Sequence, residues 1–263
     1  MIKIIKKIIV TSKTRIARGT LYLSFSEIIF VLSGYLIHIL LARKLGPSSY
    51  GTYTVVVSLV SIVNLFLTTG IPKAVSKFIS ENKKDFGSIK KSSVLLQTIF
   101  GITIFSLFLL FSKNISSMLR DSKLEPYIKI VAVMIPIFGL HSLFIGYLNG
   151  LRKYKKQAIN QTIYYVSKIV LIFILVFLGF STRGALFGFS LSPIFGLMTG
   201  IIFIGLRTNE KYFSMKKIIL FSAPITLFSI INNSVSNFDL FFVKSLIENT
   251  VATGYYSAAA TIA

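Results

Sequence analysis

Long apolar runs alternate with short polar segments along the chain. Each run is about 20 residues long, which is the length a helix needs to cross the ~30 Å hydrocarbon core of a bilayer. Residues 181–184 form the predicted turn between the fifth and sixth runs, and an eighth apolar helix begins at Gly254. The pattern predicts seven membrane-spanning helices, at residues 21–42, 53–71, 93–111, 127–148, 158–180, 185–206 and 218–246.

The stretch from Leu41 to Thr54 separates the first two runs. Its sequence, LARKLGPSSYGTYT, holds two cations, a Gly46-Pro47 pair and a second glycine between tyrosines. Gly-Pro pairs interrupt helices and mark turns. We therefore predict a hairpin turn at one membrane surface, which sets the alternation of all later spans.

Composition restricts the class of protein. Of the 263 residues, 54% are hydrophobic and 14% are charged, and the mean hydropathy is +0.77. Soluble domains carry about 25% charged residues. We therefore predict an all-α polytopic membrane protein. The sequence has no cysteine, which excludes disulfides, thiolate metal sites and thiol catalysis, and its two histidines lie on different spans. We expect no metal and no cofactor.

The formal net charge of +21 does not indicate nucleic-acid binding. The cations lie in short segments between spans, where the positive-inside bias and anionic headgroups account for them. With a cytoplasmic amino terminus, 20 of the 29 Lys and Arg residues fall inside and 8 outside. We therefore predict a multi-pass protein of the cytoplasmic membrane with its amino terminus inside. The basic leader, residues 1–20, is either an amphipathic helix on the membrane surface or a basic signal for orientation.

An internal repeat relates the beginning and the end of the sequence. Residues 39–63 and 240–263 each contain the end of an apolar helix, a cation, a polar turn and a Gly-x-Tyr that opens a new helix. Gly51 and Gly254 match at an offset of 203 residues. Six spans separate the copies, which indicates parallel six-helix repeats. We predict a leader (1–20), a six-helix bundle (21–216) and the opening of a second bundle (217–263).

Four motifs carry a family resemblance. LARKLGPSSYG, TTGIPKAVSKFIS, YLNGLRKYKKQAINQ and FSAPITLFSIINNSVSNFDLFFVKSL occur in the order and spacing seen in polysaccharide-export flippases. The chain resembles these Wzx-type translocases of O-antigen and teichoic acid, within the multidrug/oligosaccharidyl-lipid/polysaccharide (MATE-like) superfamily. The resemblance implies two six-helix bundles in a V and alternating-access transport of a polyprenyl- or dolichyl-linked glycan. It also implies glycosyltransferases of the same pathway as partners. The sequence departs from the family in length, since it ends as the second bundle begins.

Glu27 and Lys168 are charged residues within the spans, and a charge at the bilayer centre costs at least ~2.5–3.5 kcal/mol. Lys168 lies about ten residues into the fifth span, or ~15 Å at helical rise, and we predict that it meets a pyrophosphate or an anionic sugar in the transport cavity. Glu27 is shallower. It either pairs with Lys168, carries a coupling proton, or pairs with a leader cation such as Arg18.

Other polar residues are weaker candidates for the substrate or ion pathway. Asp239 is expected near the outer surface, as a functional acid or as a cap or partner of Lys244. His38 either gates the outer end by titrating or is a packing group. Asn64 is a pathway residue or an interhelical packing contact. Arg43 and Lys44 lie outside, against the charge bias, and are candidates to guide an anionic headgroup at the exit.

The sequence contains no catalytic constellation. It has no paired-carboxylate loop, no phosphate-binding glycine loop and no nucleophile elbow. We therefore predict a transporter and not an enzyme. The alternatives are a cation-coupled multidrug antiporter of the same superfamily, which uses intramembrane acids, and a membrane glycan polymerase, which needs a large outer loop.

Overall fold

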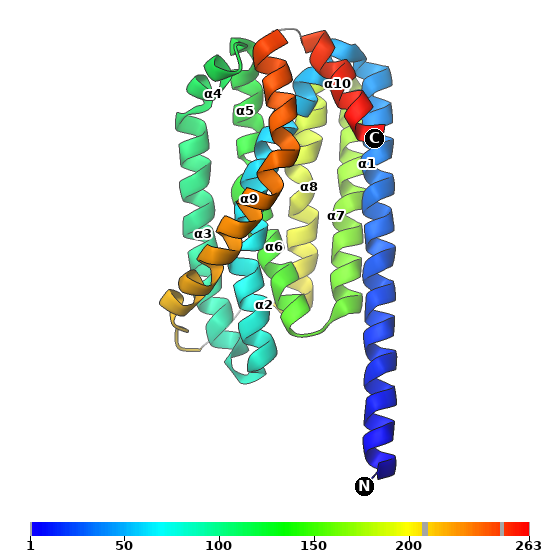
Figure 1. Cartoon of the computed structure of the whole chain (residues 1–263), viewed down its shortest axis with the longest axis vertical. Helices are drawn as coiled ribbons and strands as arrows, with labels where there is room; N and C mark the ends of the chain where they lie inside the picture. Colours follow the sequence, from blue (N-terminus) through cyan, green and yellow to red (C-terminus); the bar gives the residue numbers. More distant parts are fainter. Residues whose placement is uncertain (1, 207–209, 248–249, 263) are drawn as a thin grey trace.

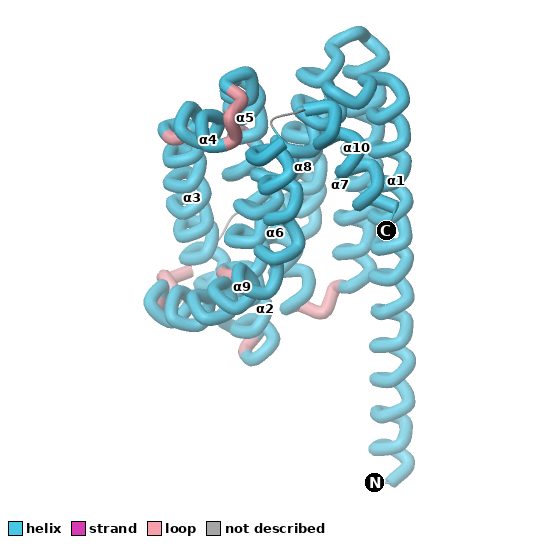
Figure 2. Tube along the Cα trace, turned by 45° about the horizontal axis from the view of Figure 1, so that its top comes forward, coloured by secondary structure: helices cyan, strands magenta, loops and turns pink. Residues whose placement is uncertain are grey.

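The structure is a computed structural model. It describes the backbone of residues 2–206, 210–247 and 250–262, and the side chains of residues 17–206, 210–229, 243, 245–246 and 251–259. Every element in this part of the chain is helical, and the predicted all-α membrane fold is confirmed (Figures 1 and 2). The α-helices are α1 (Ile2–Thr69), α2 (Ile71–Glu81), α3 (Phe86–Leu110), α4 (Ser112–Met118), α5 (Glu125–Ala132), α6 (Met134–Gly150), α7 (Tyr154–Leu175), α8 (Ser181–Ile204), α9 (Met215–Ile247) and α10 (Thr250–Ile262).

The helix α1 is two helices joined by a sharp turn at Gly46. This residue has φ 74° and ψ 169°, in the region that favours glycine, and Pro47 follows as a residue suited to begin a helix. The first part of α1 lies along one edge of the molecule and the second part returns through the bundle to α2 (Figure 1). The predicted hairpin is confirmed, although the turn is much shorter than the predicted segment. The leader is continuous with the first span and projects beyond the bundle.

The turn between the fifth and sixth spans falls earlier than predicted. Gly179 has φ 90° and Ser181 has φ 50°, so the chain reverses there after a short π-helical segment, Val176–Phe180. Residues 181–184 form the first turn of α8. The reversal thus begins two residues before the predicted turn at 181–184, because Gly179 takes the left-handed conformation within the π-helical segment, before the polar residues are reached.

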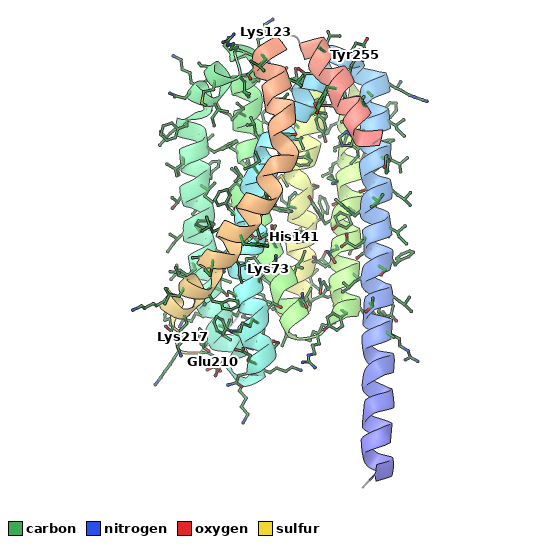
Figure 3. All side chains as sticks on the ribbon, in the orientation of Figure 1. Lys73, Lys123, His141, Glu210, Lys217 and Tyr255 are labelled. Carbon is green, nitrogen blue, oxygen red and sulfur yellow. The ribbon has the colours of Figure 1, made fainter. Side chains whose placement is uncertain are left out.

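The polar segments gather at two ends of the bundle. Lys217 and Glu210 lie at one end, whereas Lys123 and Tyr255 lie at the other (Figure 3). At the first end, the Lys91 ammonium donates to the Glu210 carbonyl (3.0 Å), which binds the segment after α8 to α3. The segments predicted on one side of the membrane therefore share one end. Four helical stretches of the described residues are long and apolar enough to cross a membrane, namely Ala17–Glu81, Lys83–Leu110, Ser122–Gly150 and Tyr154–Ile204.

Two of these stretches contain two predicted spans each, because the turns at Gly46 and Gly179 interrupt the helix for only a few residues. The multi-pass character is thus established, whereas the cytoplasmic amino terminus and the three predicted domains stay predictions.

Close packing between α2 and α6 positions the side chains described below. A Cβ added to Gly146 would come within 2.6 Å of the Pro72 carbonyl oxygen, and one added to Gly150 within 2.7 Å of the Ser76 carbonyl oxygen. Small residues four apart let two helix backbones approach closely in a membrane. Glycine at these positions brings the first turns of α2 against the second half of α6.

The two copies of the predicted repeat touch each other. The Ser257 hydroxyl donates to Thr54 Oγ1 (2.9 Å), and these residues are 203 positions apart, which is the offset of the repeat. Gly254 packs directly on the Pro47 backbone. The parallel repeat itself stays a prediction.

Candidate functional site

A cavity of about 400 Å³ lies between α1, α2, α6 and α7. This volume is within the ~300–1,000 Å³ range of small-molecule sites. Lys73 and His141 mark its position near the middle of the bundle (Figure 3). Its lining residues are Thr68, Pro72, Lys73, Ser76, Phe138, His141, Ser142, Ile145, Gly146, Asn149, Gln161, Tyr164 and Tyr165. The lining combines hydroxyls, amides, aromatic rings and one ammonium, and it contains no carboxylate.

A hydrogen-bonded network fixes His141 in this cavity. The Asn160 side-chain amide donates to the Gly196 carbonyl (2.6 Å), so Asn160 Oδ1 faces His141 Nε2 (2.9 Å). Because Oδ1 only accepts, Nε2 carries the proton and Nδ1 is an acceptor. His141 is 1% exposed, and its Nδ1 is buried without a partner. A Cβ at position 196 would collide with the imidazole ring, so the ring needs glycine there.

Aromatic rings form one wall of the cavity. The centroid of the Tyr164 ring lies 5.0 Å from that of His141, 5.2 Å from that of Tyr165 and 5.9 Å from that of Phe138. On the same helix, Gln161 also lines the cavity, and its Oε1 atom is a buried acceptor without a partner. The site thus has an apolar face beside two acceptor atoms that lack donors.

Lys168 lies one helical turn beyond the tyrosines, among aromatic rings. Its ammonium nitrogen is 5.6 Å from the ring centroid of Tyr164 and 5.9 Å from that of Tyr165, and 8% of the residue is exposed. The rings of Phe30 on α1 (5.7 Å) and Phe189 on α8 (6.0 Å) complete the cage. Within the part of the chain described here, this ammonium has no hydrogen bond and no ion pair. Tyr164 and Tyr165 contact both Lys168 and the cavity.

The hypothesis that Glu27 pairs with Lys168 is not supported. Glu27 is exposed, and no ion pair joins it to Lys168 or Arg18 among the described side chains. The reason is the orientation of α1, whose buried face is formed by Ser26, Ser33, Ile37 and Leu41. Glu27 lies beside that face and not on it.

The other predicted residues lie away from the cavity. His38 Nδ1 is 2.9 Å from the Tyr50 hydroxyl across the hairpin, a packing role that the sequence allowed. Arg43 and Lys44 are exposed at the hairpin end, where the Lys44 ammonium lies 5.0 Å from the Phe177 ring centroid. Asn64 is half-buried with an unpartnered Oδ1. Asp239 lies on α9, and its side chain and that of Lys244 are outside the described residues.

The sequence interpretation missed most of the cavity. It singled out neither Lys73 nor His141, because neither residue shows a motif by itself. The four-residue spacing of Gly146 and Gly150 was the available signal, since it indicates a close approach of α6 to another helix. Lys168, which the sequence did single out, is buried, and Gln161 on the same helix lines the cavity.

The helical arrangement defines a polytopic membrane protein with a MATE-type transporter fold. A MATE structure in complex with MaD3S matches with a TM-score of 0.74 and 20% identity, over 95% of this chain and 64% of that chain. An inward-facing multidrug resistance MATE family transporter matches with a TM-score of 0.73 and 18% identity, over 87% of this chain and 57% of that chain. These likenesses establish the fold.

The family follows from the sequence. Residues 16–263 match the family described as "Polysaccharide biosynthesis protein", and the chain belongs to this family. "Stage V sporulation protein B" of Bacillus subtilis is 27% identical over 73% of this chain and 39% of its own length. The "Putative O-antigen transporter" of Shigella flexneri is 25% identical over 84% of this chain and 56% of its own length. The chain therefore spans about half, or less, of these relatives.

Proposed function

We propose that the protein moves the headgroup of polyprenyl- or dolichyl-linked oligosaccharides across the cytoplasmic membrane, for cell-surface polysaccharide synthesis. The family, the name of the Shigella flexneri relative and the MATE-type fold support transport by alternating access. In this proposal the lipid tail stays in the bilayer while the polar headgroup enters the bundle. The protein is a transporter and not an enzyme, its amino terminus is cytoplasmic, and its partners include the glycosyltransferases that make the glycan.

The observation that carries the proposal is the charge of the cavity and its surroundings. Lys73 lines the cavity, Lys168 lies behind its tyrosine wall, and no carboxylate is among the lining residues. Charges are attracted more strongly in a low-dielectric interior than in water. A cavity with nearby cations and no carboxylate among its lining residues favours an anionic headgroup, such as the diphosphate of a lipid-linked glycan.

The alternative function is a cation-coupled multidrug antiporter, in line with the multidrug transporters of the same fold. Such an antiporter needs an acid that binds the cation or the coupling proton. Glu27 is exposed and outside the cavity, so the described residues favour the flippase.

The remaining predicted residues have secondary roles in this proposal. Arg43 and Lys44 guide the anionic headgroup at the exit, and His38 holds the hairpin through Tyr50. Glu27 and Asp239 are candidates for ion coupling, and Asn64 for the substrate path.

Translocation into inverted membrane vesicles tests the proposal. Vesicles containing the full-length protein receive a fluorescent polyprenyl diphosphate glycan, and its protection from an external glycosidase is followed over time. We expect the wild type to translocate this lipid and Lys168→Met to do so about 10-fold more slowly. Exposed Lys129→Met is the matched control, since Lys129 pairs only with Glu125 on its own helix. Absence of translocation by a folded wild type would refute the proposed function.

A further inference from the structure

We infer that the cavity is a carbohydrate subsite that binds a hydroxyl-bearing sugar ring through the acceptor atoms of His141 and Gln161. The inference deepens the proposed function, because it assigns the sugar part of the lipid-linked substrate to named residues. It also defines which ligands the cavity rejects.

The first observation is which ring nitrogen of His141 carries the proton. The Asn160 amide is oriented by Gly196, and this orientation leaves His141 Nδ1 as an acceptor with no donor. An unpartnered buried acceptor costs about 1–3 kcal/mol. A ligand that brings a hydroxyl or N–H group to this position recovers that cost.

Gln161 supplies the second acceptor, and Gln157 shows why its position matters. Both residues lie on α7, four positions apart, and each has a buried Oε1 atom without a partner. Only Gln161 lines the cavity. The two glutamines therefore have the same chemistry and the same helix, both Oε1 atoms are buried, and the two residues differ in that Gln161 is part of the cavity wall and Gln157 is not.

The aromatic wall of the cavity fits the C–H faces of a sugar ring. A pyranose ring has hydroxyl groups around its edge and C–H groups on its faces, and the C–H faces stack on aromatic rings. Tyr164 and Tyr165 present such rings beside the two acceptors. Donors for a sugar's own acceptor oxygens come from the Lys73 ammonium and the Asn149 amide, both of which line the same cavity.

The charges at the cavity disfavour organic cations, which are the competing class of ligand. Unpartnered acceptors alone would also attract an organic cation. The cavity lining, however, contains Lys73 and no carboxylate, and Lys168 lies directly behind Tyr164. The buried Lys168 ammonium would repel a permanent cation, the exposed Lys73 ammonium would repel it less because water screens that charge, and the lining offers no carboxylate, whereas a neutral or anionic sugar meets neither penalty.

Saturation-transfer NMR on the full-length protein in nanodiscs tests this inference, with N-acetylglucosamine and tetraphenylphosphonium as probes. We expect the wild type to bind the sugar and not the cation. Gln161→Leu should raise the Kd for the sugar about 5- to 10-fold, the equivalent of one hydrogen bond of about 1 kcal/mol. Gln157→Leu, the matched control, should leave the Kd within 2-fold.

Gln161→Glu provides a second variant that keeps an acceptor. We expect it to retain sugar binding and to gain measurable binding of tetraphenylphosphonium. Equal sugar binding by Gln161→Leu and the wild type would overturn the inference, since ordered water would then satisfy these acceptors. Preference of the wild type for the cation would also overturn it.

The two proposals can fail separately. Sugar binding that depends on Gln161, without translocation in vesicles, would refute the flippase and leave the carbohydrate subsite standing. Translocation in vesicles, together with a Kd for the sugar that is unchanged in Gln161→Leu, would refute the carbohydrate subsite and leave the proposed flippase function standing.

Discussion

Two buried lysines of this protein have opposite surroundings. Lys90 is 4% exposed near the start of α3, and its ammonium donates to the Gly205 carbonyl (3.3 Å). Lys168 is 8% exposed in the middle of α7, and the centroids of four aromatic rings lie 5.6 to 6.0 Å from its ammonium. Lys90 thus anchors the segment after α8 to α3. The Lys168 ammonium makes no hydrogen bond within the described residues, so it can still donate hydrogen bonds to a ligand.

The two lysines are buried to a similar extent, so burial alone does not distinguish their roles. The Lys90 ammonium meets a backbone acceptor, whereas the Lys168 ammonium is stabilised by cation–π attraction, which contributes about 0.5–2 kcal/mol per ring. We propose that the charge of Lys168 is compensated further when an anion binds in the cavity. On this proposal Lys90 is a structural lysine and Lys168 is a lysine of the transport path.

Reversing the charge of Lys168 should have the largest effect. Lys168→Glu places a carboxylate against four ring faces, which repel it, and behind a cavity proposed for an anion. We expect translocation of the lipid-linked glycan to fall by about 100-fold or more in the vesicle assay. Lys90→Glu should reduce translocation only in proportion to the amount of folded protein in the membrane. Equal losses per folded molecule would remove the distinction between the two lysines.

Of the two substitutions that neutralise a buried lysine, Lys90→Met should cause the larger loss of stability. Lys90→Met removes a charged hydrogen bond and leaves the Gly205 carbonyl to find another donor, at a cost of about 1.5–3 kcal/mol. The thermal unfolding temperature of the purified protein reports this effect. An unchanged unfolding temperature would show that the contact between α3 and the segment after α8 does not stabilise the fold.

Neutralising Lys168 should have little effect on stability. Lys168→Met fills the aromatic cage with an apolar side chain of similar length, and replacing buried charges by apolar groups is often neutral or stabilising. We expect an unfolding temperature equal to or above that of the wild type. A clear decrease would indicate that the ammonium is a structural partner, as Lys90 is.

The smallest effect is expected at the hairpin end. Arg43 and Lys44 are exposed, so water and salt screen their attraction for a headgroup. The double change Arg43→Ala with Lys44→Ala should slow translocation by about 2-fold at low ionic strength and not at all at high ionic strength. A loss as large as that of Lys168→Met would place the decisive cation at the exit and not in the bundle.

The sequence predicted the fold better than the site. Apolar runs and the Gly46-Pro47 pair are local signals, so they predicted the helical spans and the first hairpin correctly. The second reversal was misplaced because Gly179 ends α7 before the polar segment begins. In membrane helices, the polar residue nearest a turn does not always mark the turn itself.

The site depends on contacts that no local pattern reveals. Lys73 and His141 come from different helices and meet through the close approach of α2 and α6, which depends on two glycines. Lys168 could be identified because a charge at mid-span is costly wherever it faces. The exposure of Glu27 could not be predicted, since its position beside the buried face of α1 follows from tertiary packing.

The central claim is that the charge of Lys168 attracts the anionic headgroup into the cavity and that the charge of Lys90 does not. Titration of undecaprenyl diphosphate onto the full-length protein in nanodiscs, followed by native mass spectrometry, tests it most directly. We predict that Lys168→Met raises the Kd about 10-fold or more while Lys90→Met leaves it within 2-fold. Equal Kd values for Lys168→Met and the wild type would contradict the claim.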